Sequence, residues 1–217
     1  MNSDLLDIAT RAAAVSAQFL VDGWTDRAVV STKSSGTDVV TQMDRGSEAL
    51  LVQAILEQRP DDAVIGEEGG QREGSTNVTW VIDPLDGTVN YLYGLPVWAV
   101  SVGILVNGVP AVGVVNAPGL RSVWRGVAGE SAEVNGRTMR ASACRNLDQA
   151  LVATGFGYRA QVRAEQGQVV AGLLPRVRDI RRAGAAAVDL CWVAQGVLDA
   201  YFERGTHIWD RAAAMAI

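Results

Sequence analysis

The sequence predicts a mixed α/β protein built from two halves, an α+β half over residues 1–140 and an α/β half over residues 141–217. Three observations carry this prediction. Stretches of helical periodicity alternate with short apolar runs along the chain. Asn-Gly pairs between apolar runs indicate antiparallel hairpins in the first half. After residue 141, strand and helix patterns alternate, which is typical of βαβ units.

The first half opens with two predicted amphipathic helices. Apolar residues recur at helical spacing over Ser3–Val21. After a polar stretch at 29–38 that resembles a loop, Thr41 and Asp44 match a capping box, which indicates a second helix ending near Gln58. We expect this second helix to bury an apolar set: Ala49, Leu50, Val52, Ala54, Ile55 and Leu56.

Short apolar runs then predict strands. A strand at 63–65 ends in Gly-Glu-Glu-Gly-Gly and is followed by a polar loop at 71–77, and Trp80–Ile82 forms the next strand. Because Pro84 has no N–H for ladder pairing, we expect that strand to end at Asp83. Further antiparallel strands are predicted at 97–106 and 109–116 around Asn107-Gly108, at Val123-Trp124, and around Asn135-Gly136.

The second half alternates strands with helices. Strands are predicted at 151–154, 179–182 and 198–203, and helices at 160–174, at 185–195 and from Asp210 onward. The last helix is apolar, with no evident cap, polar tail or partner. Since domains seldom end inside a hydrophobic helix, we expect the C-terminal half to be incomplete.

Composition excludes several classes of protein. A hydrophobic content of 48% is enough for a globular core. The net charge of −5 argues against nucleic acid or an anionic membrane as the main partner. Neither a signal peptide nor an apolar run of the ~18 residues that a membrane span needs is evident. Cys144 and Cys191 lack metal-binding spacing, so we expect reduced core cysteines in a cytoplasmic protein.

Two pairs of carboxylates follow predicted strands and adjoin glycines: Glu67 with Glu68, and Asp83 with Asp86. If the two strands are neighbours, three or four carboxylates meet at one sheet edge, where they repel one another unless cations neutralise them. Oxygen-only ligands favour Mg²⁺, Mn²⁺ or Ca²⁺ over Zn²⁺. The N–H groups of the following Gly-Thr would supply an adjacent anion site. The alternative is an Asp-Pro/Asp-Gly turn that satisfies only its own backbone.

Other phosphatase chemistries match the sequence poorly. His207 is the only histidine, and neither cysteine is followed by the arginine of a Cys-x5-Arg loop. The spacing Asp83-x-x-Asp86 is one residue longer than the Asp-x-Asp of haloacid dehalogenase-type phosphatases, which turns the second carboxylate away. Taken singly, Asp210 is typical of the first turn of a helix and Glu203 of an exposed strand end.

Over essentially its whole length the sequence resembles the inositol monophosphatase family of metal-dependent sugar-phosphate phosphatases. Lys33–Asp44 resembles the family's first loop and helix, and Gly66–Glu68 its acidic pair. Trp80–Asn90 is similar to its Asp-Pro-x-Asp-Gly-Thr-x-Asn signature, Arg182–Ala186 to its substrate-side loop, and Tyr201–Ala213 to its second signature. The resemblance implies a layered αβαβα sandwich of the inositol monophosphatase/fructose-1,6-bisphosphatase type.

The resemblance also implies residue roles. Mg²⁺, or Mn²⁺ in its place, would be held by Glu67, Asp83, the Leu85 carbonyl, Asp86 and Asp210. Glu67 and Thr88 would orient the attacking water, with Asp44 near a more weakly held ion. The substrate would be bound by Asp86, Gly87, Thr88, Gly184, Ala185, Ala186, Glu203 and Asp210, with Asp189 near its rim.

By this resemblance the chain is expected to be a Mg²⁺-dependent, Li⁺-sensitive, homodimeric phosphomonoesterase acting on inositol 1-phosphate or a similar polyol phosphate. Relatives in the wider superfamily hydrolyse histidinol phosphate, fructose 1,6-bisphosphate or phosphoadenosine phosphate. Glu203 in its Tyr-Phe-Glu context favours inositol, and no basic cluster for a second phosphate is evident. A non-catalytic dimeric interaction protein on the same fold is the remaining alternative, although such a module need not maintain a cluster of like charges.

Overall fold

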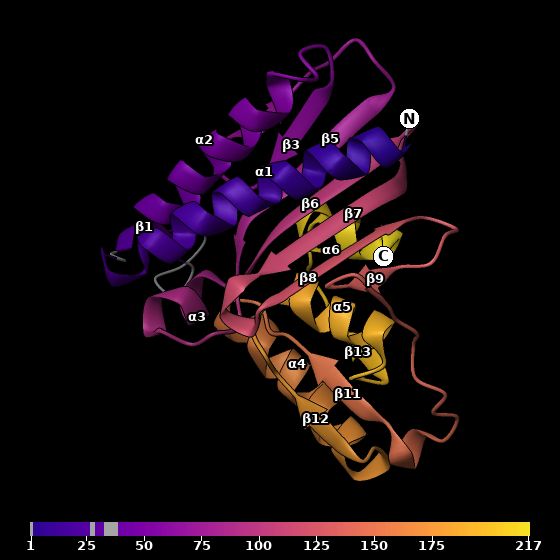
Figure 1. The fold of residues 1–217 in the computed structure, drawn as a ribbon. Helices are drawn as coiled ribbons and strands as arrows, with labels where there is room; N and C mark the ends of the chain where they lie inside the picture. The colour runs from indigo at the N-terminus through magenta and orange to yellow at the C-terminus, as the bar shows by residue number, and fades with distance from the viewer. Residues whose placement is uncertain (1, 27–28, 33–38) are drawn as a thin grey trace.

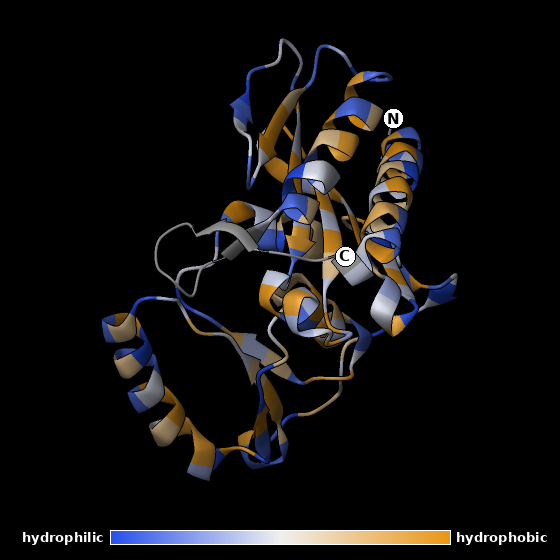
Figure 2. Ribbon diagram, turned by 90° about the vertical axis from the view of Figure 1, so that its left-hand side faces the viewer, coloured by the Kyte–Doolittle hydropathy of each residue, from blue (hydrophilic) through white to orange (hydrophobic). Residues whose placement is uncertain are grey.

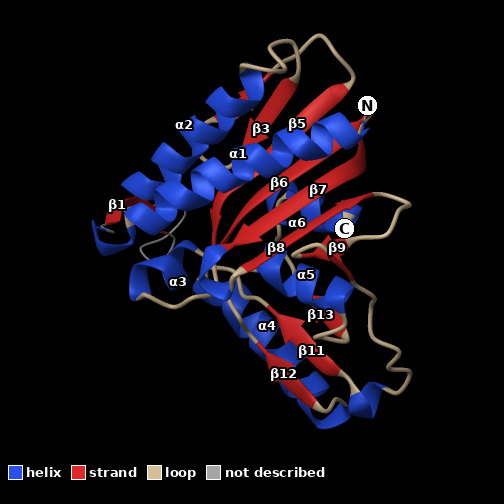
Figure 3. Ribbon diagram, viewed as in Figure 1, coloured by secondary structure: helices blue, strands red, loops and turns tan. Residues whose placement is uncertain are grey.

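The computed structural model describes residues 2–26, 29–32 and 39–217, which form a five-layered αβαβα sandwich (Figure 1). An eight-stranded sheet has two helices on each face, and a three-stranded sheet with one helix completes the stack (Figure 3). This arrangement confirms the predicted sandwich. The layer helices are α1 (Asn2–Asp22) and α2 (Gln42–Leu56) on the outer face, α5 (Ala186–Gln195) and α6 (Ile208–Ala216) in the middle, and α4 (Ala160–Leu173) at the far end.

The large sheet has the strand order β10-β9-β8-β7-β6-β5-β3-β4. Its strands are β3 (Ala63–Gly66), β4 (Gly70–Arg72), β5 (Val78–Asp86), β6 (Ala99–Val106), β7 (Val109–Ala117), β8 (Ser122–Val127), β9 (Glu133–Val134) and β10 (Arg137–Thr138). Only β3 and β5 pair in parallel within it. The predicted hairpins at Asn107-Gly108 and Asn135-Gly136 are confirmed, with positive φ at all four residues, as type I′ turns require.

The small sheet consists of β12 (Asp179–Arg181), β11 (Leu151–Thr154) and β13 (Ala200–Phe202), all parallel. It confirms the strands predicted for the second half. The remaining elements are the strand pair β1 (Val29–Thr32) and β2 (Val39–Thr41), the helix α3 (Thr88–Tyr93), and 3₁₀ turns at Trp24–Asp26, Pro118–Leu120, Leu147–Gln149 and Leu174–Arg176.

The end predicted for the strand at Trp80 was wrong. β5 continues through Pro84 to Asp86. Its pairing with β6 shifts there, because Asp83 faces Ser101 and Asp86 faces Ala99, so three steps on β5 match two on β6. A bulge of this kind accommodates a residue without an N–H and redirects the side chains around it.

The buried face predicted for α2 is confirmed in part: Ile55 is buried, and Val52, Ala54 and Leu56 pack against the core without being fully buried. Ala49 is exposed, and Leu50, Val52, Ala54 and Leu56 are half-buried. Polar side chains replace them in the interior because that side of α2 faces the carboxylate edge of the sheet. The buried residues of α2 are Met43, Asp44, Ser47, Glu48, Leu51 and Ile55.

Two predicted loops contain strands. β1 and β2 pair within the stretch 29–41, although residues 33–38 of the predicted loop lie outside the described part of the chain. β4 takes up the start of the loop predicted at 71–77 and pairs with β3. Strands this short and polar carry no periodic signal. Both cysteines are free; the core position predicted for them is confirmed for Cys191, which is buried, and was wrong for Cys144, which is exposed.

Figure 2 shows hydrophobic residues concentrated on the central strands, whereas α1 alternates hydrophobic and hydrophilic residues. The outer core, between the sheet and α1 with α2, includes Trp80 and Trp98, and the core under α5 and α6 includes Trp124. In the described residues, no helix has both the length and the apolar character to cross a bilayer.

The last helix has both a cap and a partner, contrary to the sequence-based expectation. The backbone N–H of His207 donates to Asp210 Oδ2 at 2.6 Å. Gly103 on β6 and Gly113 on β7 face each other, and a Cβ at either would come within 2.7 Å of α6 backbone. The pair of glycines lets α6 pack directly on the sheet, which brings Asp210 to the carboxylate edge.

Candidate active site

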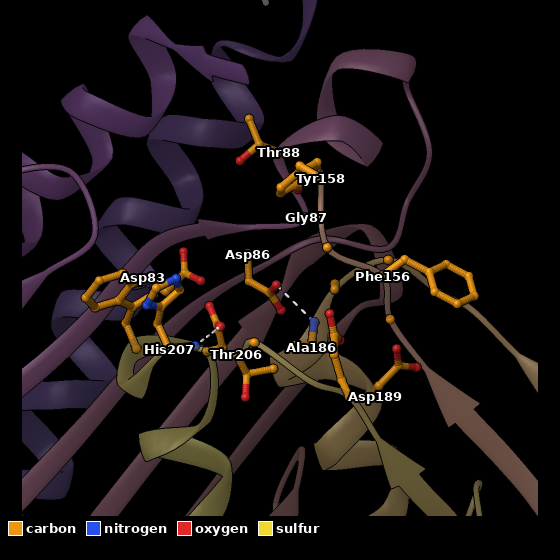
Figure 4. Close-up of a pocket in the computed structure, with 18 of the residues that line it drawn as sticks. Asp83, Asp86, Gly87, Thr88, Phe156, Tyr158, Ala186, Asp189, Thr206 and His207 are labelled. Atoms are coloured by element: carbon orange, nitrogen blue, oxygen red, sulfur yellow. Dashed lines mark hydrogen bonds between the residues drawn. The ribbon is translucent and has the colours of Figure 1, made fainter. Parts of the chain in front are cut away.

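The carboxylates predicted at two strand ends lie together. Because β3 and β5 are parallel neighbours, Glu67 after β3 and Asp83 and Asp86 on β5 share one edge of the sheet. They border a pocket of about 500 Å³ between the large sheet and the second half (Figure 4). Every residue predicted to bind metal or substrate lines it: Glu67, Asp83, Leu85, Asp86, Gly87, Thr88, Gly184, Ala185, Ala186, Glu203 and Asp210.

Asp86 joins the two halves of the molecule. The first N–H groups of α5 donate to it, Ala186 to Oδ1 at 3.0 Å and Ala187 to Oδ2 at 2.8 Å (Figure 4). A helix N-terminus carries a partial positive charge, so this placement favours a carboxylate. Burial nevertheless raises the pKa of Asp86 well above its ordinary value, and the nearby Asp210 adds to the shift.

Repulsion among neighbouring acids also raises the pKa values of the carboxylates in this cluster. Asp83 accepts a hydrogen bond from the Leu85 N–H at 3.0 Å and shares another with the Glu67 side chain. Burial raises its pKa well above the ordinary value, and the charges of Glu67, Asp86 and Asp210 raise it further. Burial raises the pKa of Asp210 to about 6, against the lowering effect of its hydrogen bond from His207. The protein alone therefore leaves this cluster short of positive charge.

A hard divalent cation fits this donor set, because all the ligating atoms are oxygens and the cluster lacks a compensating charge. Within the described ranges, however, no three His, Cys, Asp or Glu side chains form a ready-made metal cage. The carboxylates of Asp83, Asp86 and Asp210 are turned onto backbone N–H groups instead. Their backbone donors keep all three at the same edge of the sheet.

Thr88 and Asp44 form a pair beside the cluster. The Thr88 hydroxyl donates to Asp44 Oδ1 at 2.9 Å and also lies 3.1 Å from the Leu85 carbonyl. Asp44 is held by the N–H of Thr41 at 2.7 Å and is 2% exposed. Burial raises its pKa. Asp44 does not line the pocket, so it acts on the pocket through Thr88, whose lone pairs are left for a ligand.

A tight turn brings the start of α3 to the pocket. Gly87 has φ 89°, and a Cβ there would lie 3.0 Å from the Val97 carbonyl, so only glycine fits. Asn90 fastens the turn by donating to the carbonyls of Val97 at 2.6 Å and Ala183 at 2.9 Å. The first N–H groups of a helix have no internal acceptor, so those of α3 are available to an anion.

The opposite end of the pocket is formed by the second half. Glu203 follows β13 and accepts a hydrogen bond at Oε2 from the Tyr201 hydroxyl. Asp189 on α5 is buried, and burial together with the charge of Glu203 raises its pKa to about 7. The guanidinium of Arg182 lowers the pKa of both carboxylates, although burial leaves that of Glu203 raised.

Sequence reasoning missed Glu48. Its Oε2 accepts from the N–H of Glu68 at 2.8 Å, and a Cβ at Gly66 or Gly69 would lie within 2.5 Å of its carboxylate. Glu48 therefore holds the loop that carries Glu67. The available signal was the spacing of Asp44 and Glu48, four residues apart, which places both on one helical face.

Three arginines bear on the expectation that no basic cluster would hold a second phosphate. Arg159, Arg182 and Arg204 come from three separate segments, and all line the pocket. Arg204 also pairs with Glu165 at 3.1 Å. His207 stacks on Trp209 at the pocket edge, with ring centroids 4.7 Å apart, in keeping with a rim or structural role.

Comparison with known proteins gives the same picture for the whole chain. The model of the family described as the inositol monophosphatase family matches residues 1–217. Inositol-1-monophosphatase SuhB of Mycobacterium tuberculosis is 44% identical over 197 residues, which cover 87% of this chain and 68% of that protein. Nus factor SuhB of Escherichia coli K12 is 38% identical over 212 residues, covering 96% and 79%.

Solved structures agree with these matches. The extragenic suppressor protein SuhB of Bartonella henselae superposes with a TM-score of 0.92 at 30% identity, covering 98% of this chain and 84% of that one. The inositol monophosphatase of Anabaena superposes with a TM-score of 0.87 at 34% identity, covering 99% and 80%.

Proposed function

The chain belongs to the inositol monophosphatase family, and we propose that it is a Mg²⁺-dependent phosphomonoesterase that hydrolyses inositol 1-phosphate or a similar polyol phosphate. Membership makes it a phosphatase of the inositol monophosphatase type. The metal and the substrate are the proposal. One observation carries it: Asp83 and Asp86 are buried, Asp210 is half-buried beside them, and all three have raised pKa values next to the open N–H groups of a helix.

The metal ligands would be Glu67, Asp83, the Leu85 carbonyl, Asp86 and Asp210. When bound there, Mg²⁺ (or Mn²⁺ in its place) would neutralise substrate charge and lower the pKa of a bound water. The ligand carboxylates repel one another in the protein alone, so their arrangement is prepared for a cation.

Thr88 would hold the attacking water in place by accepting a hydrogen bond from it. Its own proton is directed to Asp44 at 2.9 Å, so its lone pairs can accept a hydrogen bond from water in the pocket. Asp44 is then a positioning residue, and Glu67, held on its loop by Glu48, would orient the same water.

Phosphate would bind at the start of α3. The N–H groups of Gly87 and Thr88 would donate to its oxygens, as helix N-termini do for anions. Phosphoryl transfer depends mainly on positioning and electrostatic stabilisation, so no cysteine or histidine nucleophile is needed. The leaving group would then point toward Gly184, Ala185, Ala186 and Glu203. Glu203 at that end would accept hydrogen bonds from hydroxyls, which favours a polyol.

A second candidate is a non-catalytic interaction protein that forms dimers on this fold. The observation in its favour is the similarity to relatives that are named Nus factors. The buried carboxylate cluster favours the enzyme, since a binding module gains nothing from its repulsion. We propose a homodimer in either case, which light scattering on the purified chain would test.

The direct test is phosphate release with and without a chelator from inositol 1-phosphate, histidinol phosphate and fructose 1,6-bisphosphate. We expect Mg²⁺-dependent release that is fastest from inositol 1-phosphate and is inhibited by Li⁺. Faster release from histidinol phosphate or from fructose 1,6-bisphosphate would keep the proposed mechanism but overturn the proposed substrate. If the bisphosphate is preferred, the arginines that line the pocket would bind its second phosphate. No release from any of them by folded protein would support the interaction protein.

A further inference from the structure

Asp189 carries a buried oxygen that the described residues leave without a hydrogen-bond partner. Oδ1 is shielded from solvent, and the whole residue is 1% exposed. The same side chain nevertheless borders the pocket, one turn into α5 from the N–H groups that hold Asp86. A buried acceptor is costly to leave unsatisfied, so a donor at this position is expected to come from outside the chain.

The position of Asp189 identifies which part of a ligand would supply that donor. In Figure 4 Asp189 lies across the pocket from Thr88, toward Ala186. Its carboxyl is near enough to Glu203 and Arg182 for their charges to act on it. A phosphate held at the start of α3 would therefore direct its leaving group toward Asp189 and Glu203.

Glu203 already uses part of its acceptor capacity within the chain. Its Oε2 accepts the Tyr201 hydroxyl, which leaves its other lone pairs for a ligand. Two adjacent hydroxyls offer two donors, and a second carboxylate oxygen with no partner in the described residues can accept one of them. Asp189 Oδ1 is such an acceptor on the same side of the pocket.

We propose that Asp189 and Glu203 together form the hydroxyl-recognition site of this pocket, each accepting a hydrogen bond from one of two neighbouring hydroxyls of the leaving group. The inference rests on the proposed function, because it takes the leaving group to be a polyol. It makes Asp189 a specificity-determining residue rather than part of the packing of α5.

The variants Asp189→Asn and Asp189→Ala test this assignment. Asparagine keeps the shape and a neutral acceptor, while alanine removes the acceptor. The measured quantity is kcat/KM for inositol 1-phosphate divided by kcat/KM for 4-nitrophenyl phosphate, which has no hydroxyls. We expect this ratio to fall roughly 10- to 100-fold in the alanine variant and by less in the asparagine variant. Asp179→Asn removes an exposed carboxylate paired with Arg181 and should leave the ratio unchanged.

Singly deoxygenated inositol 1-phosphates give a readout that a structural role would not move. We expect one deoxy position to lower kcat/KM of the wild type roughly 10-fold or more, and to have less than about a 2-fold effect in Asp189→Ala. Two results would overturn the role of Asp189. One is an equal loss of kcat/KM on the polyol and aryl substrates in Asp189→Ala, and the other is that every deoxy position lowers kcat/KM as much in Asp189→Ala as in the wild type. Wild type that is inactive on inositol 1-phosphate but active on the aryl substrate would instead contradict the proposed function.

Discussion

The two ends of β5 hold buried carboxylates in opposite electrostatic states. Near the start of the strand, Asp62 accepts hydrogen bonds from Arg59 at 2.7 Å, Thr76 at 2.6 Å and the Trp80 ring N–H at 2.9 Å. Burial acts to raise the pKa of Asp62, but these donors and the charge of Arg59 lower it. The Asp62 carboxylate is therefore satisfied within the chain.

At the other end of β5, Asp83 and Asp86 accept from backbone N–H groups, Asp83 also shares a hydrogen bond with Glu67, and the charges that raise their pKa values are those of other acids. Their pKa values are raised where that of Asp62 is lowered. Both ends bury carboxylates, so burial alone does not separate them. The difference is that Asp62 has the cationic partner Arg59, whereas the charges acting on Asp83 are those of other acids, for which the proposed metal would be the cation. Complete pairing indicates a stabilising site, and incomplete pairing indicates a binding site.

The largest expected effect comes from neutralising the incompletely paired end. Asp86→Asn removes a charged ligand of the proposed metal, which supplies several kcal/mol of transition-state stabilisation, so kcat/KM should fall about 10³-fold or more. The fold should remain, because the amide oxygen can still accept one of the two N–H groups at the N-terminus of α5. Steady-state kinetics and circular dichroism measure the two quantities. Retention of a tenth of the activity would place the metal site elsewhere.

A substitution near the start of β5, at Asp62, should lower the stability of the protein and leave its activity intact. Asp62→Asn leaves Arg59 without its ion pair and weakens three hydrogen bonds, so the free energy of unfolding should fall by about 2–3 kcal/mol. Below its unfolding temperature the variant should keep its kcat, since Asp62 touches no pocket residue that the mechanism uses. Urea denaturation with parallel kinetics measures both. A large loss of kcat with no loss of stability would contradict the separation of the two ends.

The carboxylates at the end of β5 were easier to recognise from the sequence than the residues that complete or hold the site. Glu67, Asp83 and Asp86 could be recognised because each follows a strand and adjoins glycine. Asp210 and Glu203 lie more than a hundred residues away, and only the family resemblance connected them to the site. Glu48 was missed because a polar helical face is normally exposed, and here it faces the buried edge of the sheet.

The fold shows the same limits. Periodicity and Asn-Gly turns were enough to predict the long helices and hairpins. The end of β5 was wrong because a bulge absorbs Pro84, and the pairing that forms a bulge is not local. Arg159, Arg182 and Arg204 were not connected with the site because they come from separate segments and line one pocket only through the tertiary fold.

A smaller effect on activity is expected from changing Glu48, which holds the loop that carries Glu67. Glu48→Gln keeps the shape but weakens the hydrogen bond to the Glu68 N–H, so the loop should loosen and kcat should fall about 10-fold, with a smaller change in KM. Glu57→Gln, an exposed change at the end of the same helix, is the matched control. If both variants behave alike, Glu48 does not position the loop.

The pH dependence of stability should also distinguish the two ends, with shifts of a few degrees in melting temperature. Asp210, with a pKa of about 6 when folded against 3.8 ordinarily, binds its proton more tightly in the folded state. Its contribution is fully present below about pH 4 and is lost as the pH rises through 6. The pKa of Asp62 is lowered, so its contribution is present above about pH 4 and is lost in more acidic solution.

Melting temperatures measured without metal from pH 3 to 9 would check these opposite signs. In Asp62→Asn the melting temperature should fall less in acidic solution than it does in the wild type. In Asp83→Asn it should fall less as the pH rises above about 4. Added Mg²⁺ should restore stability in the wild type above pH 6, because a ligand that binds only the folded state stabilises it. A melting temperature that rises steadily with pH in the absence of metal would contradict the repulsion at the carboxylate edge.

The most direct test is isothermal titration of Mg²⁺ into wild type, Asp86→Asn and Asp62→Asn at pH 8. The account predicts binding at millimolar metal or below by wild type and Asp62→Asn, and its loss in Asp86→Asn. Absence of binding by folded wild type, or equal binding by Asp86→Asn, would contradict the claim that the end of β5 is built for a divalent cation.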